Sequence, residues 1–177
     1  MWVSLLSEAR NPNMADVYLS LGSNIQRNKH ISSGINALRK QYKHVTCSPI
    51  YESVAVGFEG ENFYNLVTHF ETNEPLDMVS AFLTKVEDDN GRDRSGAKFG
   101  PRTLDLDLLL YNDTVINSKD LTLPRPEIYH NAFVLKPLAD IAGDLLDPVL
   151  KETYQQLWSS FDQSKQRLWP IELSRSN

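Results

Sequence analysis

The segment Gly91–Tyr111 constrains the fold of this 177-residue chain more than any other. Its second half, residues 103–111, alternates apolar Leu104, Leu106 and Leu108 with Asp105 and Asp107. Such alternation predicts a β-strand that turns its leucines into the core and both carboxylates to the other face. Its first half, residues 91–102, is a glycine-rich loop with four cations: Arg92, Arg94, Lys98 and Arg102.

The two halves of this segment predict complementary chemistry. Carboxylates two residues apart on a strand lie about 6.5–7 Å apart along the chain. They suit a hard cation such as Mg²⁺, which prefers oxygen ligands and often keeps substrate phosphates among them. The cations of the loop supply groups that bind phosphate oxygens. The pattern therefore indicates phosphoryl transfer from a nucleotide. The alternative is an exposed loop before a half-buried strand whose acidic face is solvated.

The periodicities of the remaining chain predict an α+β fold. Strands are expected at 17–21, 44–51, 63–71 and 103–111, and helices at 28–42 and from Pro75 to Asn90. This order predicts a ferredoxin-like βαββαβ core, an antiparallel sheet with helices on one face. Short strands at 114–116 and 121–123 and extra C-terminal helices at 132–142 and 151–161 follow. We expect one domain over 14–170, after an extension at 1–13 and before a tail at 171–177.

Composition narrows the class of protein. The net charge of −5 argues against general nucleic-acid binding and fits an enzyme whose cations are concentrated locally. The single cysteine, Cys47, cannot form an internal disulfide. No apolar run is long enough to span a membrane, and the first residues lack the cationic start of a signal peptide. We therefore expect a cytoplasmic monomer that binds neither nucleic acid nor membrane.

The same segment carries a family resemblance. The run KFGPRTLDLDLL at 98–109 resembles the signature of the 6-hydroxymethyl-7,8-dihydropterin pyrophosphokinase family. Four shorter motifs match in order: LSLGSN at 19–24, FYN at 63–65, LTLP at 121–124 and AFVLKPL at 132–138. The resemblance implies transfer of the β,γ-diphosphate of ATP to the 6-hydroxymethyl group of the dihydropterin, with release of AMP, in folate biosynthesis.

The resemblance also implies roles for individual residues. Asp105 and Asp107 would bind two Mg²⁺ ions, and with Arg92 and Arg102 they would form the catalytic set. The residues implied for ATP binding are Glu87, Arg92, Arg94, Lys98, Arg102, Leu108, Leu121, Thr122 and Arg125. Those implied for the pterin are Ser53, Val54, Val56, Phe63, Asn65, Asp105 and Phe133. The two phenylalanines suit stacking on a flat heterocycle, and the asparagine offers donors and an acceptor to its edge.

Two positions depart from the family pattern, and two other functions stay open. Family members commonly carry His at the position of Arg125 and Arg at that of Asn131. One alternative is therefore a paralogue that has drifted toward another pterin or lost activity. The other is a ferredoxin-like binding module, such as an RNA-recognition domain. Asp105 and Asp107 weigh against the latter, because carboxylates on a central strand repel phosphate unless a metal is bound.

Overall fold

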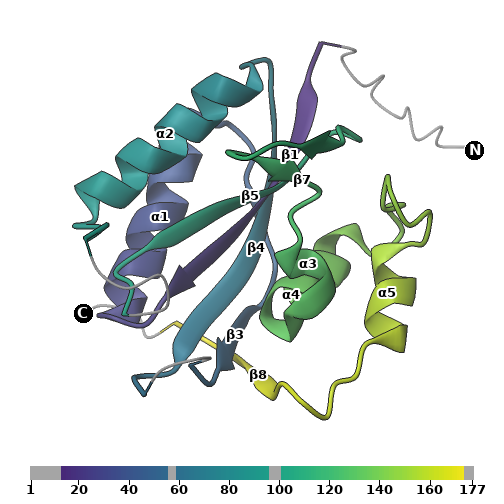
Figure 1. The fold of residues 1–177 in the computed structure, drawn as a ribbon. Helices are drawn as coiled ribbons and strands as arrows, with labels where there is room; N and C mark the ends of the chain where they lie inside the picture. The colour runs from purple at the N-terminus through teal and green to yellow at the C-terminus, as the bar shows by residue number, and fades with distance from the viewer. Residues whose placement is uncertain (1–12, 56–58, 96–100, 174–177) are drawn as a thin grey trace, which may run out of the picture.

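The computed structural model describes residues 13–55, 59–95 and 101–173. An antiparallel sheet with the strand order β5-β1-β4-β3-β8 forms its centre, and β2 also pairs with β4 (Figure 1). Its strands are β1 Ala15–Ser23, β2 Thr46–Cys47, β3 Ile50–Ser53, β4 Phe63–Thr72, β5 Asp105–Tyr111 and β8 Leu168–Ile171. A separate hairpin joins β6 Ile116–Asn117 and β7 Thr122–Leu123. The helices are α1 Arg27–Gln41, α2 Leu76–Asp89, α3 Glu127–His130, α4 Ala132–Ala142 and α5 Tyr154–Ser160.

The predicted mixture of helices and antiparallel sheet is confirmed, but the expected strand at 44–51 is divided. It forms β2 and β3, which are separated by Ser48 and Pro49. The hydroxyl of Ser48 accepts the Val67 N–H at 3.0 Å, where a backbone carbonyl would continue the ladder. Pro49 has no N–H to donate to the ladder. These two residues therefore interrupt a segment that periodicity alone predicts as continuous.

Helices cover both faces of the sheet, whereas the sequence predicted them on one. Helices α1 and α2 cover the first face, and α4 and α5 lie on the opposite side (Figure 1). Val67, Leu109 and Leu110 are buried against α4 and its neighbours. The pairing of β1 with β5 shifts its register between Tyr18 and Leu19. Near this shift two consecutive residues of β5, Leu109 and Leu110, both lie in the second core. The second apolar face needs its own cover, and the C-terminal helices supply it.

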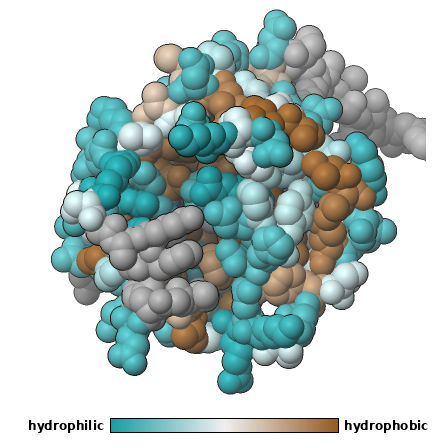
Figure 2. All heavy atoms as spheres, in the orientation of Figure 1, coloured by the Kyte–Doolittle hydropathy of each residue, from teal (hydrophilic) through white to brown (hydrophobic). Residues whose placement is uncertain are grey.

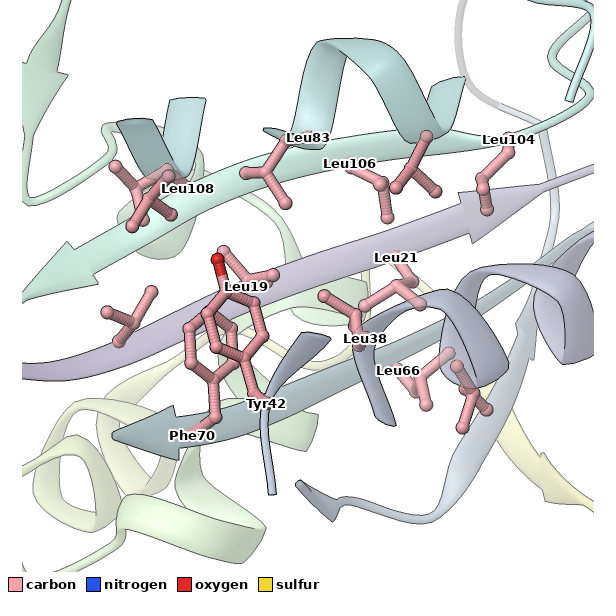
Figure 3. Packing of buried hydrophobic residues seen from close by; sticks show 14 of the residues in the cluster. Leu19, Leu21, Leu38, Tyr42, Leu66, Phe70, Leu83, Leu104, Leu106 and Leu108 are labelled. Atoms are coloured by element: carbon pink, nitrogen blue, oxygen red, sulfur yellow. The ribbon is translucent and has the colours of Figure 1, made fainter. Parts of the chain in front are cut away.

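The first core lies between the sheet and helices α1 and α2. Leucines from β1, β4 and β5 meet Leu38 of α1 and Leu83 of α2 there (Figure 3). The Tyr42 ring stacks on Phe70 with 3.7 Å between the ring centroids. This packing holds β5 firmly, because Leu104, Leu106 and Leu108 are all buried in it.

The C-terminal segment returns to the sheet, although a loose tail was expected from residue 171. Strand β8 runs to Ile171 and pairs with β3, with Ser53 opposite Leu168. Leu173 packs against the first core. An edge strand tolerates Pro170, since an edge position need not donate every N–H.

The four-residue helix α3 was also not predicted, because one turn carries no detectable periodicity.

An apolar patch lies on the surface between α4 and α5. Leu145, Leu146, Val149 and Leu150 are exposed on the connection between α4 and α5, seen as brown spheres at the right of Figure 2. Most of the remaining described surface in this view is hydrophilic. Among the described residues, none of the helices combines the length and apolarity needed to cross a bilayer.

Asp147 ties the C-terminal helices together and provides a test of their stability. This fully buried carboxylate accepts hydrogen bonds from the Tyr129 hydroxyl at 2.7 Å, the Tyr154 hydroxyl at 3.2 Å and the backbone N–H groups of Val149 and Leu150. We expect Asp147→Ala to lower the free energy of unfolding by about 3 kcal/mol, because it leaves buried donors without an acceptor.

Urea denaturation measures this change, with the exposed Asp144→Ala as the control. A midpoint for Asp147→Ala equal to that of the control would contradict the prediction.

Candidate active site

Asp105 and Asp107 project from the sheet face opposite α1 and α2. They alternate along β5 with Leu106 and Leu108, whose side chains lie in the first core. Their own side chains are 33% and 32% exposed, so a ligand can reach both. The alternation in the sequence therefore predicted the shared face of the two carboxylates correctly.

Gly22 has no side chain between Asp105 and Asn65. It lies on β1 between Asp105 of β5 and Asn65 of β4. A Cβ atom added at Gly22 would lie 3.4 Å from Asn65 Oδ1 and 4.0 Å from Asp105 Cβ. These are ordinary van der Waals distances, so the absent side chain leaves a shallow, methyl-sized hollow between a carboxylate and an amide. Sequence reasoning did not assign Gly22, although it lies within the LSLGSN motif.

The buried amide of Asn65 connects this hollow to β3. Asn65 Nδ2 donates to Ser53 Oγ at 2.9 Å, and both side chains are buried. Phe63 begins β4 opposite Ser53, and its Cδ1 atom would lie 3.9 Å from a Cβ atom added at Gly22. The structure therefore brings together four of the residues implied for the pterin: Ser53, Phe63, Asn65 and Asp105.

Each carboxylate of β5 faces an arginine. Arg92 Nη1 donates to Asp105 and also to the Leu104 carbonyl, the latter at 3.1 Å. Arg125 Nη2 lies 2.9 Å from Asp107 Oδ1. Burial raises the pKa of Asp107, and the nearby Asp105 charge raises it further, while Arg125 opposes both effects. A bound cation would favour the ionised form of this carboxyl group.

Glu87 supports the edge of β5. Its Oε1 accepts the Leu106 N–H at 2.8 Å, at the residue between the two aspartates. Its carboxylate also lies 3.6 Å from Arg92 Nη1 and 2.9 Å from Arg94 Nη2. Burial raises the pKa of Glu87, and the Leu106 hydrogen bond and the Arg92 charge oppose that rise. The ATP contact that the family resemblance implies for Glu87 stays a prediction. In the structure this side chain binds the otherwise unpaired edge of β5.

The loop before β5 is joined to the end of β1. The Arg102 N–H donates to Asn24 Oδ1 at 2.7 Å, and its carbonyl accepts from the N–H groups of Asn24 and Ile25. Arg94 is more exposed and pairs with Glu87 and Asp88. Arg102, the last residue of the GPR motif, thus lies beside the LGSN motif. Lys98 and Val56, predicted for ATP and pterin, lie outside the described residues.

Three apolar or neutral residues implied for ATP binding are divided between the core and a surface hairpin. Leu108 is buried in the first core, on the face away from Asp107. Leu121 packs at the margin of the same core, and Thr122 lies in β7 opposite Asn117. Only the last two present partly exposed side chains beside β5.

A pocket of about 350 Å³ opens near the hollow beside Gly22. Three residues implied for the pterin line it: Ser53, Val54 and Phe133. The far wall comes from Lys165, Gln166, Arg167 and Leu168 of the C-terminal segment. Sequence reasoning missed these residues, because nothing local in the segment indicates that it folds back onto β3.

The two carboxylates of β5 fit a hard cation that takes its remaining ligands from a bound anion and from water. Within the described residues, no group of three or more His, Cys, Asp or Glu side chains is arranged to hold a metal alone. Two carboxylates would leave further coordination positions to phosphate oxygens and water. The buried Nε of Arg92 has no hydrogen-bond partner among the described residues, so this donor is unsatisfied.

An α+β fold that places two accessible carboxylates opposite two arginines is typical of enzymes that act on phosphorylated substrates. The family model described as 7,8-dihydro-6-hydroxymethylpterin-pyrophosphokinase (HPPK) matches residues 18–143. The chain belongs to this family.

Curated relatives agree with the family match. The chain is 36% identical over 145 residues to 2-amino-4-hydroxy-6-hydroxymethyldihydropteridine pyrophosphokinase of Aquifex aeolicus, covering 81% of this chain and 90% of that protein. It is 40% identical over 136 residues to folic acid synthesis protein fol1 of Pneumocystis carinii, covering 75% of this chain. Only 18% of that fungal protein is matched, so the chain corresponds to one region of it.

A solved structure shows the same fold. The crystal structure of Plasmodium falciparum HPPK-DHPS wild type with SDX-DHP superposes with a TM-score of 0.63 and 17% sequence identity. The match covers 82% of this chain and 43% of that chain. At this identity the likeness concerns the fold alone.

Proposed function

We propose that this chain transfers the β,γ-diphosphate of ATP to the 6-hydroxymethyl group of 6-hydroxymethyl-7,8-dihydropterin, giving the pterin diphosphate and AMP in folate biosynthesis. The observation that carries the proposal is the pair Asp105 and Asp107, accessible on one strand face and flanked by Arg92 and Arg125. Family membership supports this function over a drifted paralogue or a binding module without activity.

Several finer features belong to the same proposal. The core is ferredoxin-like, which the order β5-β1-β4-β3 supports, with α1 following β1 and α2 following β4. The enzyme is a cytoplasmic monomer, and its domain, expected over 14–170, extends through β8 to Leu173. Its substrates are ATP and the dihydropterin, and its cofactor is a pair of Mg²⁺ ions.

In the proposed reaction the pterin hydroxyl oxygen bonds to the β-phosphorus while the bond from that phosphorus to the AMP oxygen breaks. Asp105 and Asp107 would hold the Mg²⁺ ions, which when bound neutralise phosphate charge and lower the pKa of a coordinated hydroxyl. Arg92 and Arg102 would bind phosphate oxygens. Because these groups are held by β5 and by the end of β1, positioning and charge stabilisation supply most of the rate.

The pterin would lie in the hollow beside Gly22 and in the adjoining pocket. Asn65 and Ser53 are buried polar groups suited to the edge of the heterocycle, and Phe63 and Phe133 offer faces for stacking. This position directs the hydroxymethyl group toward Asp105. The arrangement separates the pterin end of the site from the phosphate end at Arg92.

Measuring AMP release from MgATP with and without 6-hydroxymethyl-7,8-dihydropterin tests the proposal. We expect AMP to form only when the pterin is present. Absence of AMP with retained pterin binding would favour the drifted paralogue. Failure to bind either substrate would favour the binding module.

Gly22→Ala tests where the pterin lies. We expect the KM for the pterin to rise about tenfold, because a methyl group enters the hollow that the ring would occupy. The KM for ATP should stay close to that of the wild type. Initial rates with the other substrate saturating measure both constants.

Gly34→Ala is the matched control, because its methyl group would press on Leu104 and Leu21 in the core at 3.2–3.3 Å. It adds the same methyl group away from the site and should leave the KM for the pterin unchanged. An unaltered pterin KM in Gly22→Ala would contradict the proposed position.

A further inference from the structure

The C-terminal segment forms one side of the pocket that the proposed function assigns to the pterin. The opposite sides are the end of β3, represented by Ser53 and the following Val54, and the start of α4, represented by Phe133. These two walls come from parts of the chain about eighty residues apart in the sequence. Their separation therefore depends on what connects them in space.

Strand β8 attaches the C-terminal segment to the first wall. Leu168 is paired with Ser53, and the ladder continues to the pair of Ile171 with Ile50. Leu168 and Ser53 both line the pocket. The backbone of this segment is thus fixed to the strand that ends at Ser53, one of the residues implied for the pterin.

Gln166 attaches the same segment to the second wall. Its Oε1 accepts the Ala132 N–H at 2.8 Å, and its Nε2 donates to the His130 carbonyl at 2.7 Å. Ala132 is the first residue of α4, and Asn131 before it supplies no side-chain cap. One amide side chain therefore satisfies a first-turn N–H group of α4 and a carbonyl at the end of α3.

We propose that Gln166 is a positioning residue for the pterin, acting as a brace that sets the distance between Ser53 and Phe133. This inference rests on the proposed function. Two hydrogen bonds from one side chain fix both the position and the direction of the backbone next to Phe133. Without them the start of α4 keeps its packing and the hydrogen bond from the Asn131 N–H to the Glu127 carbonyl, and the stacking face loses its direct link to the segment paired with Ser53.

The phosphate end of the site is anchored independently of this brace. The backbone N–H of Arg125 donates to the Leu109 carbonyl of β5 at 3.0 Å, and its side chain pairs with Asp107. Arg92 is held by β5 and α2. Loss of the brace should therefore weaken pterin binding and leave ATP binding in place, which a general loss of folding would not do.

Gln166→Met tests the brace, because methionine keeps the length of the side chain and lacks the amide. We expect the KM for the pterin to rise about tenfold while the KM for ATP and kcat stay within about twofold, since two hydrogen bonds to one wall are lost. Gln166→Glu keeps an acceptor for the Ala132 N–H and loses the donor to His130, so its pterin KM should be intermediate. Gln163→Met, an exposed position on the same segment, is the control.

An unchanged pterin KM in Gln166→Met would overturn the brace, as would an equal rise in the KM for both substrates or a fall in thermal stability alone. If the wild type forms no AMP but binds the pterin, the proposed function fails and the same comparison is made on the calorimetric Kd. A wild type that does not bind the pterin overturns both inferences.

Discussion

Asp107→Asn is expected to lower the rate of pterin-dependent AMP formation by about three orders of magnitude, because metal coordination in such sites is worth several kcal/mol of transition-state stabilisation. Asparagine keeps the shape of the side chain and removes its charge. In the structure Asp105 and Asp107 are the two acidic residues of β5, and they share one face of the strand.

Initial rates across a Mg²⁺ titration measure the effect and separate two of its origins. A loss that high Mg²⁺ partly restores indicates weakened metal binding, and a loss at all concentrations indicates misplaced phosphates. Asp120→Asn, an exposed acid outside the site, should behave as the wild type. AMP formation that survives Asp107→Asn would leave the class of enzyme standing and refute the metal assignment.

Arg92→Met is expected to lower kcat/KM for ATP by about a hundredfold, because removing one preorganised donor to a developing charge typically costs that much or more. The Arg92 side chain is only 16% exposed and meets Asp105, the Leu104 carbonyl and Glu87. When phosphate enters, the guanidinium group would exchange part of its contact with Asp105 for the ligand.

The same initial-rate assay, with ATP varied at saturating pterin, measures the change. Arg39→Met on the exposed surface of α1 is the matched control and should have no effect. Arg92→Lys keeps the charge without the forked geometry, so it should recover only part of the loss. A full recovery with lysine would show that charge alone matters, and wild-type kinetics for Arg92→Met would remove Arg92 from the phosphate site.

Local sequence patterns determined the elements that carry the chemistry. The alternation in 103–111 predicted the shared face of Asp105 and Asp107, and the helical spacing after Pro75 predicted α2. The Asn90-Gly91 pair predicted its end, where Gly91 adopts a φ of 73°. These features depend on neighbours within a few residues, so the order of residues along the chain is enough to predict them.

Tertiary structure alone decided how these elements meet. Glu87 reaches the Leu106 N–H across nineteen residues, Gln166 reaches Ala132 across thirty-four, and β8 closes the sheet beside β3. The second helical layer likewise depends on the tertiary structure, because the C-terminal helices bury apolar side chains on the second face of the sheet. Such contacts join segments whose separation leaves no periodicity in the sequence. The chain therefore encodes its reactive groups locally, while the width of the pocket and the support of the aspartate strand arise only when distant segments pack together.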